Sequence, residues 1–121
     1  MGLDMYALTL DRQPESPVDF DGKEGAEIHY WRKHPNLHGW MQNLYYEKGG
    51  AEDSFNCVNL QLTADDLDEL ETAIREKALP DTRGFFFGIS EGSEIEDDLE
   101  FVAKAREAIS AGLTVFYTSW W

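Results

Sequence analysis

The chain has 121 residues, a length that fits one domain with one hydrophobic core. Hydrophobic residues make up 42% of it and include four Trp, five Tyr and seven Phe, a content that excludes a disordered acidic tail. The net charge is −14, from 24 acids against 10 bases. This surplus argues against direct binding to nucleic acid or anionic membranes and favours a basic protein partner, while acidity that serves solubility alone is an equal alternative.

The cysteine content and the apolar runs indicate the compartment. Cys57 is the single cysteine and cannot form an internal disulfide, and no apolar run is long enough for a signal peptide or a membrane span. We therefore expect a cytoplasmic protein. Cys57 falls in a predicted strand without a nucleophile motif, so an ordinary half-buried thiol is expected.

The first part of the chain predicts two strands and a helix. Residues 3–10 predict a strand buried on both faces, and residues 27–32 predict a second strand after a loop rich in Pro and Gly. Pro35 suits the first position of a helix. The sequence Lys48-Gly49-Gly50 is typical of a helix end, so the helix is expected to stop there. Apolar residues recur between these limits at helical spacing, namely Leu37, Trp40, Met41, Leu44 and Tyr45.

The rest of the chain predicts three strands and two helices. Strands are expected over residues 55–62, 85–87 and 113–121. Thr63 with Asp66, and Ser93 with Glu96, resemble capping boxes that begin helices, the first of which runs to about residue 79. The order β-β-α-β-α-β-α-β predicts a single α+β domain over residues 1–121, with a mixed β-sheet of about five strands covered by three helices.

Residues 29–38 gather all three histidines and two of the 10 bases next to aromatic residues. Most clusters of this kind consist of buried aromatic residues, hydrogen-bonded histidines and surface ion pairs. The alternative is that this cluster, together with residues from both ends of the chain, forms a ligand-binding or catalytic pocket. Its members are Tyr6, His29, Trp31, Arg32, His38 and Trp120. No cysteine, further histidine or acid at a recognised spacing completes a metal site, and the glycines at 84 and 88 match no phosphate or dinucleotide motif, so we expect neither metal nor cofactor.

Half of the acids lie in two windows, residues 65–76 and 91–100, each of which spans a predicted helix start. The helix dipole favours carboxylates there and explains part of the pattern. If both windows share one face, their carboxylates predict a surface that binds a basic partner. The candidate partner-binding residues are Asp65, Asp66, Asp68, Glu69, Glu94, Asp97 and Asp98.

An ordered set of short motifs covers most of the chain: MGLDMY at the start, YWRK with a following H-G-W, GFFFG, and Y-T-S-W at the end. The set resembles a family of small phage- and prophage-associated proteins without an assigned function. The resemblance implies a mobile-element origin and a bacterial host cytoplasm, and by analogy it favours proteins that block host machinery.

Three functional hypotheses follow from these patterns. The leading one is an acidic protein–protein interaction domain, a phage-encoded inhibitor that binds a basic surface of a host nucleic-acid-handling or defence protein. The second is a small-ligand-binding or catalytic domain built on the histidine, tryptophan and arginine pocket. The third is a structural or assembly component that works as a homo-oligomer.

Overall fold

The computed structural model describes residues 2–80 and 95–121. These residues form one α+β domain, in which four strands and three helices follow in the order β1-β2-α1-β3-α2-α3-β4. The strands are β1 (Asp4–Leu10), β2 (Ala26–Arg32), β3 (Leu60–Leu62) and β4 (Thr114–Trp120). The helices are α1 (Pro35–Glu47), α2 (Ala64–Arg75) and α3 (Ile95–Ser110). The predicted α+β class is confirmed.

The strands form one sheet in the order β2-β1-β4-β3, and every neighbouring pair is antiparallel. The prediction of a mixed sheet is therefore wrong for the described strands. The β1–β4 and β3–β4 pairs join strands that lie far apart in the chain, and local sequence patterns do not reveal the direction of such pairs. The described residues hold four strands rather than about five, and the strand predicted at 85–87 lies outside them.

Helices α1 and α2 begin where the local signals indicate. Pro35 occupies the first turn of α1, and Thr63 with Asp66 forms a complete capping box at the start of α2. Helix α2 ends at Arg75, earlier than predicted. The capping box predicted from Ser93 falls in the segment outside the described residues. Among the described residues no helix is long and apolar enough to cross a membrane.

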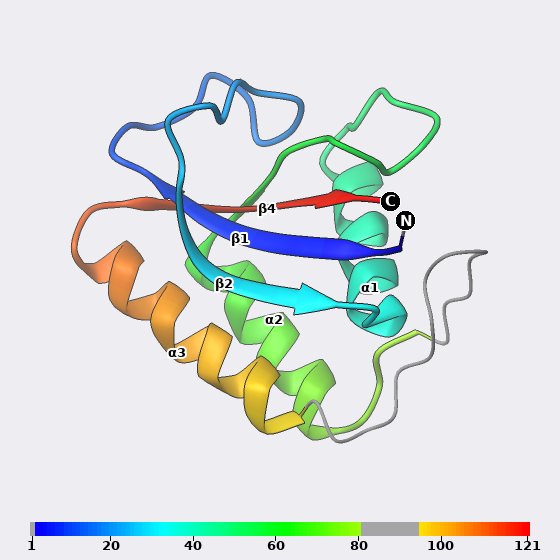
Figure 1. Ribbon diagram of the computed structural model, residues 1–121. Helices are drawn as coiled ribbons and strands as arrows, with labels where there is room; N and C mark the ends of the chain where they lie inside the picture. Colours follow the sequence, from blue (N-terminus) through cyan, green and yellow to red (C-terminus); the bar gives the residue numbers. More distant parts are fainter. Residues whose placement is uncertain (1, 81–94) are drawn as a thin grey trace.

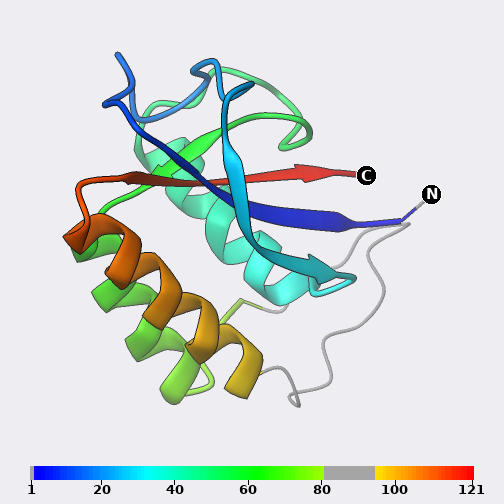
Figure 2. The same cartoon turned by 60° about the vertical axis from the view of Figure 1, so that its left-hand side comes forward.

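All three helices lie on one side of the sheet (Figures 1 and 2). Met5 and Ala7 of β1 face them and are fully buried, whereas Tyr6 and Leu8, which alternate with them, are only partly buried. The prediction that the first strand is buried on both faces is therefore wrong. We call these two sides of the sheet the covered face and the open face.

A loop covers one end of the open face. Phe20 packs edge-on against Phe116 of β4, with ring centroids 5.3 Å apart. Gly22 and Gly25 also lie against Phe116, where an added Cβ would come within 2.7 and 2.8 Å of its ring. The loop between β1 and β2 therefore needs glycine at these points. Within residues 2–80 and 95–121, the other end of the open face is left uncovered, and Tyr30 and Trp120 are exposed there.

The segment before β3 differs most from the sequence prediction. The predicted strand over 55–62 shrinks to Leu60–Leu62, because Cys57 has a left-handed backbone with φ of 59°. Its N–H donates to the Ser119 carbonyl at 2.8 Å, which holds the segment against β4 outside a regular ladder. Cys57 is exposed, so the expected half-buried thiol in a strand is also wrong.

Candidate functional site

The sheet separates the residues predicted to line one pocket. Arg32 and Trp120 both pair with Asp4, and Tyr6 alternates with Met5, so Tyr6, Arg32 and Trp120 belong to the open face. Trp31 pairs with Met5 and His29 with Ala7, so both belong to the covered face, as does His38 of α1, which contacts Tyr117. The structure thus brings these residues together as two groups on opposite faces.

His38 is a core residue. Its side chain is fully buried, its Nδ1 lies 2.7 Å from the Tyr117 hydroxyl, and its ring packs against Phe55 at 4.9 Å between centroids. Burial lowers the pKa of His38 to about 4, which keeps the imidazole neutral at pH 7. Burial also raises the pKa of Tyr117 well above its ordinary value. This pair matches the alternative of a hydrogen-bonded structural histidine.

Asp98, predicted to face a partner, instead turns into the protein. It is 2% exposed and accepts hydrogen bonds from Trp31 Nε1 at 3.1 Å and from His34 Nε2 at 2.8 Å. The three side chains tie the start of α3 to β2 and to the residue before α1. Asp98 therefore fixes the position of α3 and is not available to a partner.

Asp66 is also directed inward. Its backbone N–H and its carboxylate complete the capping box with Thr63, and the carboxylate pairs with Lys48 at the end of α1. Lys48 Nζ donates as well to the Gln61 carbonyl at 2.7 Å. Asp66 thus stabilises the junction of α1, β3 and α2.

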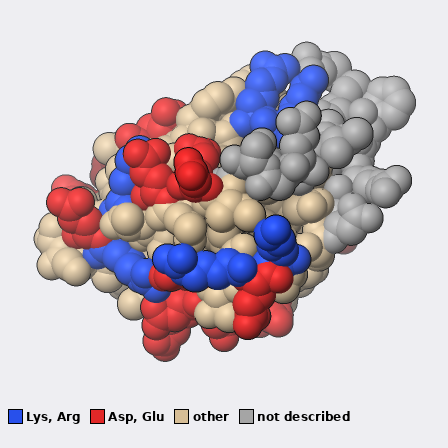
Figure 3. All heavy atoms as spheres, turned by 90° about the horizontal axis from the view of Figure 1, so that it is seen from below, with Lys and Arg blue, Asp and Glu red and all other residues tan. Residues whose placement is uncertain are grey.

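The described acids of the two windows do not form one continuous surface. Arg106, near the end of α3, contacts Asp68 and Glu71, near the start and middle of α2, so the two helices run antiparallel and their acidic first turns lie at opposite ends of the pair. Figure 3 shows acidic and basic side chains interleaved on the side where α2 and α3 lie. Asp65 and Glu69 are exposed, and Glu94 lies outside the described residues.

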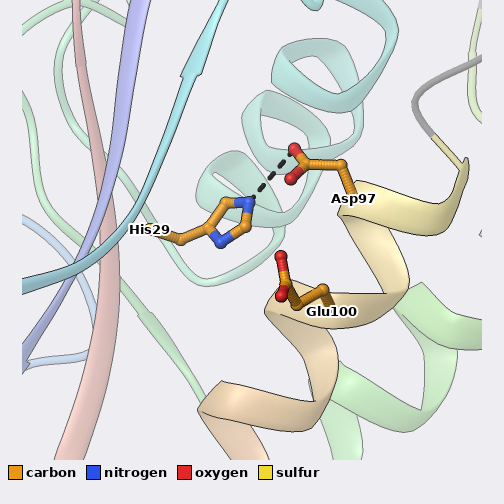
Figure 4. A group of neighbouring side chains, drawn as sticks. All are labelled: His29, Asp97 and Glu100. Atoms are coloured by element: carbon orange, nitrogen blue, oxygen red, sulfur yellow. Dashed lines mark hydrogen bonds and ion pairs between the residues drawn. The ribbon is translucent and has the colours of Figure 1, made fainter.

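His29, Asp97 and Glu100 form a cluster where α3 crosses β2 (Figure 4). Asp97 and Glu100 project from one side of α3 towards His29, whose Nε2 lies 3.1 Å from Asp97 Oδ2. Each of the three side chains offers one ligand atom, and these atoms all lie within 4.8 Å of one another. Lys104 Nζ, one turn further along α3, lies 3.4 Å from His29 Nδ1. Sequence reasoning missed this cluster because 68 residues separate His29 from Asp97.

A separate cluster lies on the uncovered end of the open face. The rings of Tyr6 and Tyr30 are 5.3 Å apart, and the Tyr30 hydroxyl donates to Asp4 Oδ1 at 2.6 Å. Arg32 Nη1 lies 3.9 Å from the same carboxylate oxygen. Trp120 is 68% exposed and Tyr30 is 44% exposed. We call Asp4, Tyr6, Tyr30, Arg32 and Trp120 the open-face patch.

Acidic side chains raise the pKa of both tyrosines in the open-face patch. Burial raises the pKa of Tyr6, and the charges of Asp4 and Glu27 raise it further. The hydrogen bond to Asp4 raises the pKa of Tyr30. A shallow hollow beside the patch is lined by Gly2, Asp4, Trp120 and Trp121. The sequence prediction missed Asp4 and Tyr30, although strand alternation places them on the same face as Tyr6 and Arg32.

The chain matched no protein-family model, no curated protein and no solved structure.

Proposed function

We propose that the protein is an interaction module whose open-face patch binds a basic segment of a partner protein. The observation that carries this proposal is the exposure of Tyr30 and Trp120 on the uncovered end of the sheet. Tyr, Trp and Arg are the residues that contribute most often to the binding energy of protein interfaces. All three occur in the patch, around one carboxylate.

The charge of the molecule selects the class of partner. Asp4 compensates the positive charge of Arg32, and Glu27, whose charge raises the pKa of Tyr6, adds a negative charge beside the patch. Exposed Tyr and Trp rings also attract Arg and Lys side chains through their π faces. The net charge of −14 adds long-range attraction that speeds encounter with a basic surface.

This proposal keeps the interaction hypothesis and moves its centre from the acidic helices to the sheet. The acids of α2 and α3 contribute to attraction at a distance, while Asp66 and Asp98 serve the fold. A phage-encoded inhibitor of a host nucleic-acid-handling or defence protein is the form of the proposal that the sequence resemblance favours, with the bacterial cytoplasm as its location. The ligand-pocket hypothesis is less well supported, because its residues divide between two faces.

Affinity capture from a bacterial lysate, quantified by mass spectrometry at low and high salt, tests the proposal. The wild type is compared with a Tyr30→Ala, Trp120→Ala double variant and with Tyr46→Ala, which removes an exposed aromatic residue from α1. We expect a basic protein that the wild type and the Tyr46→Ala variant retain, that high salt releases, and that the double variant captures at least tenfold less.

Two outcomes contradict the proposal. One is equal capture of the basic protein by the double variant, provided that circular dichroism shows it folded. The other is a wild-type dimer in light scattering that the double variant converts to a monomer, since the patch then binds a second copy of the chain.

A further inference from the structure

We propose that His29, Asp97 and Glu100 form a binding site for a divalent transition-metal ion. An imidazole nitrogen with two carboxylates is a ligand set that suits zinc, manganese or cobalt better than calcium or magnesium, which prefer oxygen ligands alone. The site lies on the covered side of the sheet, away from the open-face patch. Its test is therefore independent of the proposed interaction.

The spacing of the ligand atoms fits an ion between them. Metal–ligand bonds of about 2.0–2.2 Å place neighbouring ligand atoms about 3 to 3.5 Å apart. The His29 Nε2 and Asp97 Oδ2 atoms are 3.1 Å apart, which already satisfies this spacing. Glu100 lies one helical turn from Asp97 on the same side of α3, and its ligand atom is within 4.8 Å of the other two. A side-chain rotation of this exposed glutamate completes the set.

One ligand is held firmly and the others are open to solvent. The His29 side chain is buried between Trp31 and Phe101, with ring centroids 4.5 and 5.7 Å from its own. The Asp97 side chain is 49% exposed, so water can occupy the remaining coordination positions. A fixed imidazole at the edge of solvent lowers the entropy cost of ordering the site.

Glu100 supplies the observation that separates a metal site from a simple ion pair. Its carboxylate makes no hydrogen bond or ion pair with residues 2–80 or 95–121, although it lies beside Asp97 and His29. If the cluster served only to anchor α3, the His29–Asp97 contact would suffice. A second carboxylate adds repulsion at this point, and a bound cation relieves that repulsion.

Lys104 opposes metal binding at His29. An ammonium group only donates, so His29 Nδ1 accepts from Lys104 and the ring proton lies on Nε2, which donates to Asp97. A metal ion takes the Nε2 lone pair, so the ring proton moves to Nδ1 and Lys104 must turn away. Lys104 therefore weakens metal binding by its charge and by its hydrogen bond.

Calorimetric titration of chelator-treated protein with Zn²⁺, Mn²⁺ and Co²⁺ tests the site, together with the visible spectrum of the Co²⁺ form. We expect one saturable site per chain. Asp97→Asn with Glu100→Gln, which preserves the side-chain shapes, is expected to weaken binding roughly tenfold or more. Asp65→Asn removes an exposed acid from the start of α2 and is expected to leave binding unchanged.

Two further measurements separate the site from general attraction by an acidic surface. Lys104→Gln removes the opposing charge and offers an oxygen to the Nδ1 proton, so it is expected to bind the ion more tightly. In proton–nitrogen NMR spectra, Co²⁺ is expected to shift the His29 ring signals more than those of His34 and His38. The absence of saturable binding, equal binding by the Asp97→Asn, Glu100→Gln variant, or equal shifts of all three histidines would overturn the proposal.

Discussion

The two faces of the sheet use the same kinds of residue in opposite ways. On the covered face, the Tyr117 hydroxyl forms a hydrogen bond with His38, and the Trp31 indole N–H forms one with Asp98, both inside the protein. On the open face, Tyr30 and Trp120 keep large parts of their rings in solvent. Successive side chains in a strand point to opposite sides. One step along β2 therefore separates the exposed Tyr30 from the buried Trp31, and in β4 the buried Tyr117 and the exposed Trp120 lie three positions apart on opposite faces.

This comparison shows that residue type alone does not identify a site in this protein. Trp31 and Trp120 are both tryptophans near an acid, yet only Trp120 is accessible. Asp98 and Asp97 are neighbours on α3, yet Asp98 is 2% exposed and Asp97 faces solvent. The consequences of substitution should therefore follow the face rather than the residue type.

The largest expected difference is between Phe101 and Trp120. Phe101 is fully buried and packs edge-on against Trp31 at 4.8 Å. Phe101→Ala is expected to lower the free energy of unfolding by about 3–5 kcal/mol, and Trp120→Ala by no more than about 0.5 kcal/mol. Urea denaturation followed by circular dichroism measures both. A loss for Trp120→Ala close to that for Phe101→Ala would show that the open face is part of the core.

A second comparison uses the adjacent acids of α3. Asp98→Ala leaves the buried donors of Trp31 and His34 without their acceptor and is expected to lower the free energy of unfolding by about 3 kcal/mol. Asp97→Ala removes a half-exposed contact with His29, with an expected loss below about 1 kcal/mol. Thermal and urea unfolding of both variants at pH 7 would check this. Equal losses would contradict the inward role of Asp98.

The pH dependence of stability gives a smaller and more specific effect. The folded protein holds His38 neutral, with its pKa lowered from 6.5 to about 4, so as pH falls the unfolded chain takes up this proton first. The contribution is complete above about pH 6.5 and is lost progressively down to about pH 4. At 1.36 kcal/mol per pKa unit the loss is about 3 kcal/mol.

Measuring the free energy of unfolding from pH 7 to pH 4 for the wild type and for His38→Asn isolates this contribution. The variant offers an amide to the Tyr117 hydroxyl and lacks the titrating group, so its stability should decline less over this range. Parallel curves for the two proteins would show that His38 is accessible to protons in the folded state.

Local signals in the sequence predicted the starts of α1 and α2 correctly. Pro35 and the Thr63–Asp66 capping box act within one turn, so no distant contact is needed to recognise them. The antiparallel order of the strands and the left-handed backbone at Cys57 depend on β4, which comes much later in the chain. Sequence patterns of short range do not contain that information.

The candidate sites were predictable to different degrees. Strand alternation alone places Asp4 beside Tyr6 and Tyr30 beside Arg32, so most of the open-face patch follows from residues close in sequence. The cluster of His29, Asp97 and Glu100 depends on the packing of α3 beneath β2. The spacing of these three residues in the sequence does not show that they lie close together in the folded protein.

The irregular edge of β2 bears on how the protein behaves when concentrated. Ile28 has no partner in β1, because the pairing shifts between Ala7 and Leu8, and Lys104 Nζ lies 3.5 Å from its carbonyl oxygen. A long regular edge strand would template the addition of further chains, whereas a bulge with an adjacent lysine interrupts that template. These two features work against strand-to-strand aggregation at the β2 edge, next to the face on which Tyr30 is exposed.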